Sequence, residues 1–158
     1  LAVSDGLFLQ IGKQIAAENP DIEFEHFIID DFLCRMISRP HDLDVVVMPN
    51  LYGDIMSDGA AGLIGGIGLA PSGCYGVDYA YFESAHGTAP DIAGKNVINP
   101  TATILSAAML LEYLTYTDAA EALANAVAQV YAAGVTLTPD QGGRASTSDF
   151  FAAVRAAL

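Results

Sequence analysis

Apolar residues recur at helical spacing in several parts of the chain. In SDGLFLQIGKQIAAENP they fall at positions 7, 8, 11, 15 and 16, and Asn19-Pro20 ends the pattern, which predicts a helix capped by Ser4 or Asp5. Other runs predict further helices: DDFLCRMIS (30–38), YGDIMSDGAAGLIGG (52–66), TATILSAAMLLEYL (101–114), DAAEALANAVAQVYAA (118–133) and STSDFFAAVRAAL (146–158). We expect Asp30 or Asp31 to cap the helix that Pro40 stops, Gly134 to end the fifth helix, and one of residues 146–148 to cap the last.

Three segments have the pattern of strands. Residues 22–29, IEFEHFII, alternate apolar and polar positions, and residues 43–49, LDVVVMP, form a compact β-branched run typical of a buried strand. A further strand is expected in DYAYFESAHG, residues 78–87. Because strands and helices alternate along the chain, the predicted class is α/β.

The charge narrows the range of partners. Nineteen acidic and 6 basic residues give a net charge of -13, which argues against nucleic acid and anionic membrane surfaces, since both require a basic footprint. Such a surface is compatible with a divalent cation, or it simply keeps the protein in solution. No apolar run reaches the roughly 18 residues that span a bilayer. The first residues do not have the pattern of a signal peptide, and two cysteines outside any C-x-x-C pair indicate a reducing compartment.

Asp54 and Asp58 stand four residues apart in a predicted helix. Residues at this spacing lie on one helical face, with Cβ atoms about 5–6 Å apart, so the two carboxylates repel unless a cation or water separates them. Mg²⁺ prefers such hard oxygen ligands, and Asp30 or Asp31, after a predicted strand, can add a third carboxylate. The alternative is two solvated acids near the start of a helix, where the macrodipole favours them.

The segment HGTAPD, residues 86–91, is a loop by composition. Gly87 permits positive φ and Pro90 stiffens the turn, while Asp91 follows at once. A loop with an imidazole, a hydroxyl, open backbone amides and one carboxylate suits an adenosine whose free 2′-hydroxyl is met by an acid. An ordinary surface loop with one histidine is the alternative. No G-x-G-x-x-G is present, so a dinucleotide would bind without that motif.

Together, NLYGDIMSD, GGIGLAPSG, FESAHGTAPDIAGK and NPTATILSAAMLLEYL resemble the metal-dependent β-decarboxylating dehydrogenases, a family of isocitrate, isopropylmalate, homoisocitrate and tartrate dehydrogenases. The resemblance runs from SDGLF to TSDF and is strongest to NAD-dependent isocitrate dehydrogenases. It implies an isopropylmalate dehydrogenase-like fold, with residues 1–60 contributing to a small dimerisation domain that carries the metal carboxylates. Residues 61–158 would then form the C-terminal part of a large NAD-binding domain.

The resemblance also implies a reaction: NAD⁺ oxidises a 2-hydroxy acid such as isocitrate, which then loses CO₂ to give 2-oxoglutarate, with Mg²⁺ or Mn²⁺ as a Lewis acid. Asp54 and Asp58 would be metal ligands, and Asp30 would reach the partner subunit's site across a dimer interface. The cofactor residues implied by the resemblance are His86, Gly87, Thr88, Ala89, Pro90, Asp91, Ile92 and Asn99, with Asp91 on the ribose and Asn99 at the adenine. Relatives that use NADP carry a Lys-Tyr pair where this chain has Asp91-Ile92, so we expect NAD.

Members of the family are about twice as long, and their catalytic lysine and tyrosine match no residue here; both are expected upstream of Leu1. We therefore expect the 158 residues alone to be inactive. Isopropylmalate, homoisocitrate or tartrate are alternative substrates, and a non-catalytic regulatory subunit or a plain metal- or nucleotide-binding module are alternative functions. The expected assembly is a homodimer or hetero-oligomer, located in the cytoplasm or, in a eukaryote, the mitochondrial matrix.

Overall fold

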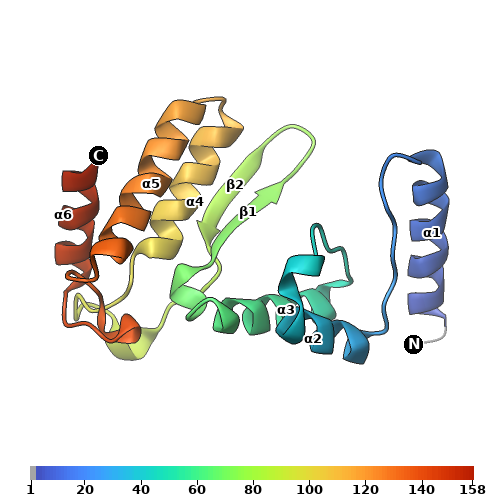
Figure 1. The fold of residues 1–158 in the computed structure, drawn as a ribbon, viewed down its shortest axis with the longest axis horizontal. Helices are drawn as coiled ribbons and strands as arrows, with labels where there is room; N and C mark the ends of the chain where they lie inside the picture. The colour runs from blue at the N-terminus through green and yellow to red at the C-terminus, as the bar shows by residue number, and fades with distance from the viewer. Residues whose placement is uncertain (1–2) are drawn as a thin grey trace. The chain divides into compact units, whose positions relative to one another are not determined.

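A computed structural model describes residues 3–158 of the chain. Its helices and strands are α1 (Ser4–Glu18), α2 (Ile29–Ser38), α3 (Asn50–Leu63), β1 (Pro71–Tyr75), β2 (Ala80–Ser84), α4 (Thr101–Tyr113), α5 (Thr117–Ala133) and α6 (Thr147–Ala157) (Figure 1). The contacts divide the chain into an N-terminal unit that ends at Gly53 and a C-terminal unit that begins at Asp54. The boundary falls inside α3. The two functional domains predicted from the sequence, 1–60 and 61–158, stay a prediction.

The core of the C-terminal unit lies where α5 packs against α6 and α4. Phe150 and Val154 of α6 are almost completely buried against Ala126, Val127 and Val130 of α5. Figure 1 shows α4, α5 and α6 side by side, with the β1–β2 hairpin along α4. Many of the buried positions of α4 and α5 hold alanine, and these small side chains let the helices approach closely.

The two strands form an antiparallel hairpin that one buried serine joins to α4. Pro71 pairs with Ser84 at one end of the register, and Tyr75 pairs with Ala80 at the other. Ser106 Oγ of α4 lies 2.5 Å from the Glu83 carbonyl oxygen of β2 and accepts a hydrogen bond from the Ser72 amide of β1 at 3.2 Å. A single hydroxyl therefore satisfies backbone groups of both strands.

The predicted helices are confirmed, and two of their end signals act as expected. Gly134 ends α5 with a left-handed φ of 66°. Ser146 caps α6: its hydroxyl accepts from the Asp149 amide, and the Asp149 carboxylate accepts from the Ser146 amide at 3.0 Å, a capping box. The predicted caps of α1 and α2 are wrong. The helix α1 begins at Ser4, so Ser4 and Asp5 lie inside its first turn, and α2 begins at Ile29 and places Asp30 and Asp31 in its first turn.

Two predicted strands are also wrong. Residues 22–28 and 43–49 form no strand, because a strand requires a hydrogen-bonded neighbour and none pairs with them among residues 3–158. The β-branched run is correspondingly exposed, with Val45 at 90% and Val47 at 76% of their accessible surface. The strand expected in 78–87 is confirmed as β2, whereas β1 was not predicted, since its sequence PSGCY lacks a clear alternation.

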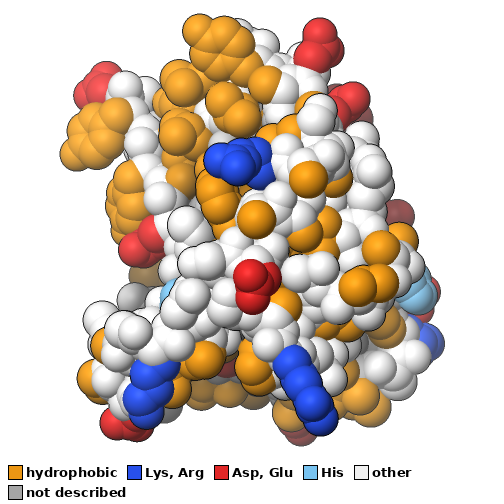
Figure 2. Space-filling view, turned by 90° about the vertical axis from the view of Figure 1, so that its left-hand side faces the viewer, with side chains coloured by type: hydrophobic (Ala, Val, Ile, Leu, Met, Phe, Trp, Pro, Cys, Tyr) orange, Lys and Arg blue, Asp and Glu red, His pale blue; other side chains and the backbone are white. Residues whose placement is uncertain are grey.

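The predicted α/β alternation is therefore formed only in part. Residues 3–158 are mostly helical and contain one hairpin. In the N-terminal unit, α2 buries Phe32 and Met36, while α1 buries none of its side chains. Figure 2 looks onto the side of α6 and shows hydrophobic side chains at the surface with charged ones scattered among them. Within the described part of the chain, no helix is both long enough and apolar enough to cross a bilayer.

Candidate functional site

Asp54 and Asp58 lie on α3 with the spacing that the sequence predicted. The helix begins at Asn50, so neither acid is in its first turn. The alternative explanation, acids stabilised by the N-terminal end of the macrodipole, is weakened because that effect fades beyond the first turn. Both side chains are exposed, and among residues 3–158 neither carboxylate forms an ion pair, that is, no basic nitrogen lies within 4.0 Å of its oxygens. The two carboxylates therefore present oxygens to solvent on one face of a helix.

Asp30 lies in the first turn of α2, in the N-terminal unit, and is also exposed. Its Oδ1 accepts a hydrogen bond from the Asp31 amide at 3.0 Å. Asp31 is engaged differently, in an ion pair with Arg35 of 3.1 Å between Oδ2 and Nε. In the part of the chain that the structure describes, no three His, Cys, Asp or Glu side chains gather closely enough to hold a metal. The metal roles of Asp30, Asp54 and Asp58 stay a prediction.

The segment from His86 to Ile92 is a loop that ends in a short 3₁₀ turn, Pro90–Ile92. The His86 Nδ1 lies 2.9 Å from the Gly87 carbonyl oxygen, so its N–H donates there. Ala89 has φ of 43°, a left-handed conformation uncommon for a residue with a side chain. Strained backbone of this kind often marks a binding loop. Asp91 and Ile92 are both exposed.

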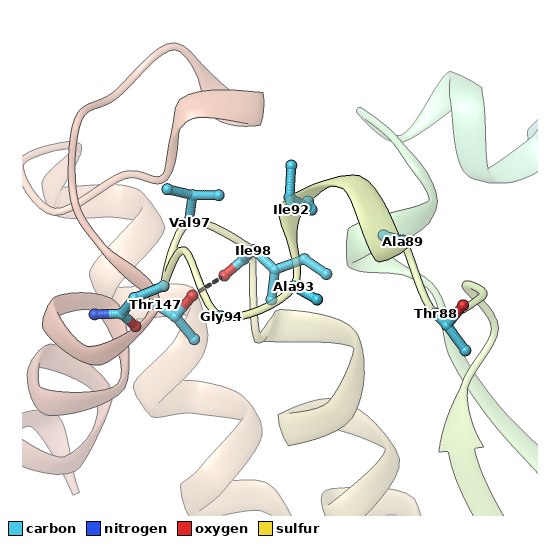
Figure 3. Close-up of a pocket in the computed structure, with 9 residues that line it drawn as sticks. Thr88, Ala89, Ile92, Ala93, Gly94, Val97, Ile98 and Thr147 are labelled. Carbon is cyan, nitrogen blue, oxygen red and sulfur yellow. Dashed lines mark hydrogen bonds between the residues drawn. The ribbon is translucent and has the colours of Figure 1, made fainter.

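A pocket of about 360 Å³ opens beside this loop (Figure 3). It is lined by Thr88, Ala89, Ile92, Ala93, Gly94, Asn96, Val97, Ile98 and Thr147. Three of the predicted cofactor residues, Thr88, Ala89 and Ile92, thus share one hollow, whereas His86, Asp91 and Asn99 do not line it. The wall is largely aliphatic, which suits the flat face of a ring, and the hydroxyls of Thr88 and Thr147 add two polar groups.

One wall of the pocket is held by the start of α6. The Thr147 hydroxyl donates to the Ile98 carbonyl oxygen at 2.6 Å, as Figure 3 shows, and the Thr147 amide donates to the Asn96 carbonyl oxygen at 2.9 Å. Asn96 has φ of 57°, and its side-chain oxygen accepts from the amide and the hydroxyl of Ser148. The first backbone N–H groups of α6 thus donate to the loop that this helix supports.

Asn99 is 3% exposed, and its side chain is fully used inside the protein. Its Nδ2 donates to Asp140 Oδ2 at 2.9 Å and to the Tyr131 hydroxyl at 3.0 Å, and its Oδ1 accepts from the Thr101 amide at 3.0 Å. An amide has two N–H donors, and both are engaged. The predicted contact of Asn99 with an adenine would therefore have to involve its backbone.

Asp140 is the charged member of this network. Burial alone would raise its pKa, but the Thr138 side chain and hydrogen bonds from Asn99 and Gln141 outweigh that effect and hold the pKa below its usual value. The Thr138 hydroxyl is fully buried and, within residues 3–158, makes no hydrogen bond of good geometry. Gln141 Nε2 also donates to the Gly65 carbonyl oxygen at 3.0 Å, just beyond the end of α3.

Sequence reasoning missed the supporting residues Asn96, Tyr131, Asp140, Gln141 and Thr147. Each has at least one partner 30 or more positions away, up to 76 for Gln141 and Gly65, so no local pattern marks them. The one available signal was LTPDQGGR, a loop that contains an acid and an amide between turn residues.

The chain matches the isocitrate/isopropylmalate dehydrogenase family over residues 1–154. It is 49% identical to a Drosophila melanogaster protein named probable isocitrate dehydrogenase [NAD] subunit alpha, mitochondrial, over 95% of this chain and 40% of that one. It is 50% identical to the 3-isopropylmalate/3-methylmalate dehydrogenase of Methanocaldococcus jannaschii, over 93% of this chain and 44% of that one.

Among solved structures, isocitrate dehydrogenase from Methylococcus capsulatus superimposes with a TM-score of 0.92 at 45% identity, over 98% of this chain and 47% of that one. The predicted isopropylmalate dehydrogenase-like fold is thus shown for a portion of such a chain. The chain spans about half the length of the relatives that it matches or less. By sequence and by fold, the chain belongs to the isocitrate/isopropylmalate dehydrogenase family.

Proposed function

We propose that the protein containing this chain catalyses the NAD-dependent, metal-dependent oxidative decarboxylation of isocitrate to 2-oxoglutarate. The observation that carries the proposal is the pair Asp54 and Asp58 on one face of α3, exposed and without a cationic partner in residues 3–158. Membership of a family of β-decarboxylating dehydrogenases supports the reaction class.

The donor set of α3 fits a hard divalent cation. Two carboxylates at this spacing offer the oxygen ligands that Mg²⁺ and Mn²⁺ favour, while water and substrate oxygens complete the shell of such ions. Asp54 and Asp58 would hold the ion, and Asp30 of a second subunit would add a third carboxylate. When bound, the ion supplies Lewis acidity at the oxygens of the reacting 2-hydroxy acid.

The loop from His86 to Ile92 would bind the adenosine half of the cofactor. Asp91 is exposed and carries the charge that accepts hydrogen bonds from ribose hydroxyls and repels a 2′-phosphate, so it favours NAD over NADP. Ile92, Ala89 and Val97 provide apolar surface in the adjoining pocket. In this role the chain's own residues bind and orient the cofactor.

The choice of isocitrate rests on the resemblance of the motifs to NAD-dependent isocitrate dehydrogenases. The two relatives above differ in the substrate that their names state, at 49% and 50% identity. The test uses the full-length product of the gene, with NAD⁺ and Mn²⁺, on isocitrate, homoisocitrate and 3-isopropylmalate. A kcat/KM at least about tenfold higher for isocitrate, a difference of about 1.4 kcal/mol in transition-state binding, is expected. A preference for either of the others would overturn the substrate assignment.

The 158 residues by themselves are expected to be inactive, and the full-length protein to act as a homodimer or hetero-oligomer. Purified as a fragment, they should not reduce NAD⁺ with isocitrate. Calorimetry of the full-length protein with Mn²⁺ and NAD⁺ separates an enzyme from a structural subunit: binding of neither would favour the structural role.

A further inference from the structure

The chain that borders the pocket continues into Asn99, a residue to which the proposed function gives no role. Asn99 follows the pocket residues Val97 and Ile98 directly in sequence. Its side-chain amide has no N–H group left for a ligand, because one donates to Asp140 Oδ2 and the other to the Tyr131 hydroxyl. Whatever fixes Asn99 therefore also fixes the backbone that borders the pocket.

Asp140 is the strongest of these anchors. An ionised carboxylate accepts hydrogen bonds about twice as strong as those of a neutral acceptor, and Asp140 Oδ2 accepts from Asn99 at 2.9 Å and from Gln141 at 3.0 Å. Gly68 packs beside this contact: a Cβ built there would lie 3.4 Å from Asn99 Cβ and 3.8 Å from Asp140 Oδ2, both ordinary packing distances. Through Gln141 and Gly65 the same carboxylate is also joined to the chain that follows α3.

We propose that Asp140 is a positioning residue for the nicotinamide cofactor: by holding the Asn99 amide it sets the backbone of Val97–Asn99 against the adenosine pocket. The inference rests on the proposed function and deepens it. Asp140 itself does not line the pocket and acts through Asn99. Thr147 and Ser148 of α6 also donate to Ile98 and Asn96, so the segment before α4 is bonded both to α6 and to the loop that carries Asp140.

The experiment measures NAD⁺ binding and steady-state kinetics of the full-length protein and its Asp140→Asn variant. The substitution keeps the shape and removes the charge. We expect the Kd and KM for NAD⁺ to rise about tenfold, while kcat at saturating NAD⁺ and the affinity for Mn²⁺ stay within about twofold of the parent. Asp118→Asn, the same charge change in the exposed first turn of α5, is the matched control and should alter none of these values.

A polarity reversal distinguishes positioning from a general loss of structure. In the double variant Asn99→Asp with Asp140→Asn, the amide at 140 donates to the carboxylate at 99, and the Thr101 amide still has its acceptor. Recovery of most of the NAD⁺ affinity is expected for the double variant and not for Asn99→Asp alone. Should Asp140→Asn fail to fold, Tyr131→Phe removes a single hydroxyl from the same network and should raise the Kd by about threefold.

The outcomes separate this inference from the proposed function. If the parent binds NAD⁺ and the folded Asp140→Asn variant binds it equally well, the positioning role is wrong and the proposed function stands. Absence of recovery in the double variant also overturns the positioning role. If the parent itself fails to bind NAD⁺ with Mn²⁺ and substrate present, the proposed function fails and the inference falls with it.

Discussion

Asn99 and Asp140 are 41 positions apart in sequence, and a hydrogen bond of 2.9 Å joins their side chains. This contact connects the segment just before α4 to the loop between α5 and α6. The Tyr131 hydroxyl of α5 closes the network, because it lies 2.8 Å from the Thr101 hydroxyl. Four segments of the C-terminal unit thus meet through polar groups that satisfy one another.

Replacing Asp54 tests the metal site. Asp54→Asn in the full-length protein removes one of two charged ligands with little change in shape, so Mn²⁺ binding should weaken by at least about tenfold and turnover should be lost. Calorimetric titration with Mn²⁺ and an NADH absorbance assay measure the two effects. Asp118→Asn is the control, and normal Mn²⁺ affinity in the Asp54 variant would contradict the assignment.

Cofactor choice is tested by a double variant in the loop. Asp91→Lys with Ile92→Tyr exchanges a carboxylate for a cation and adds a hydroxyl at exposed positions. A 2′-phosphate then meets an attractive charge, so the ratio of kcat/KM for NADP⁺ to that for NAD⁺ should rise by at least about tenfold. Measured with both cofactors at a fixed salt concentration, an unchanged ratio would count against the loop as the adenosine site.

The cap of α6 offers a test of stability. Ser146→Ala removes the hydroxyl that accepts from the Asp149 amide and donates to its carboxylate at 2.7 Å. A lost cap of this type lowers the free energy of unfolding by about 1 kcal/mol. Urea unfolding followed by circular dichroism measures this loss. Ser148→Gly and Ser57→Ala would not test the cap, because neither residue caps α6. An unchanged midpoint would contradict the role of the capping box.

Acidic pH should destabilise the C-terminal unit. Hydrogen bonds from Ser146 lower the pKa of Asp149, and Asp140 also has a lowered pKa although burial opposes the hydrogen bonds it accepts. A carboxyl whose pKa is lower when folded stabilises the fold above its unfolded value, near 3.8, and that contribution is lost as pH falls through the folded pKa. We therefore expect stability to fall below about pH 4 and the fall to be shallower in Ser146→Ala, as urea midpoints across the pH range would show.

Two glycines make opposite predictions for substitution by alanine. At Gly143 a Cβ would overlap the Leu137 carbonyl group, which also accepts from the Ala145 amide, so Gly143→Ala should cost about 2 kcal/mol or more through backbone displacement. At Gly62, within α3, a Cβ meets nothing within 4 Å, and Gly62→Ala should stabilise the helix by about 0.5–1 kcal/mol. Urea unfolding should show a lower free energy of unfolding for Gly143→Ala and a higher one for Gly62→Ala than for the parent.

The sequence by itself determined the helices, the family and the identity of the candidate ligands. Helix periodicity and end signals such as Gly134 and Ser146 are local, because the residues that interact lie within one or two turns. The pair Asp54 and Asp58 was visible for the same reason, since its spacing alone places both on one face.

Only the tertiary structure decided which strands form and which residues hold the segment before α4. Residues 43–49 have the composition of a strand but remain unpaired within residues 3–158, because pairing depends on a neighbour that composition cannot specify. Likewise the family resemblance predicted Asn99 as a ligand of the adenine, yet folding brings Asp140 and Tyr131 to its side-chain amide, which donates to both. Contacts between residues far apart in sequence depend on how helices pack, and no local pattern encodes them.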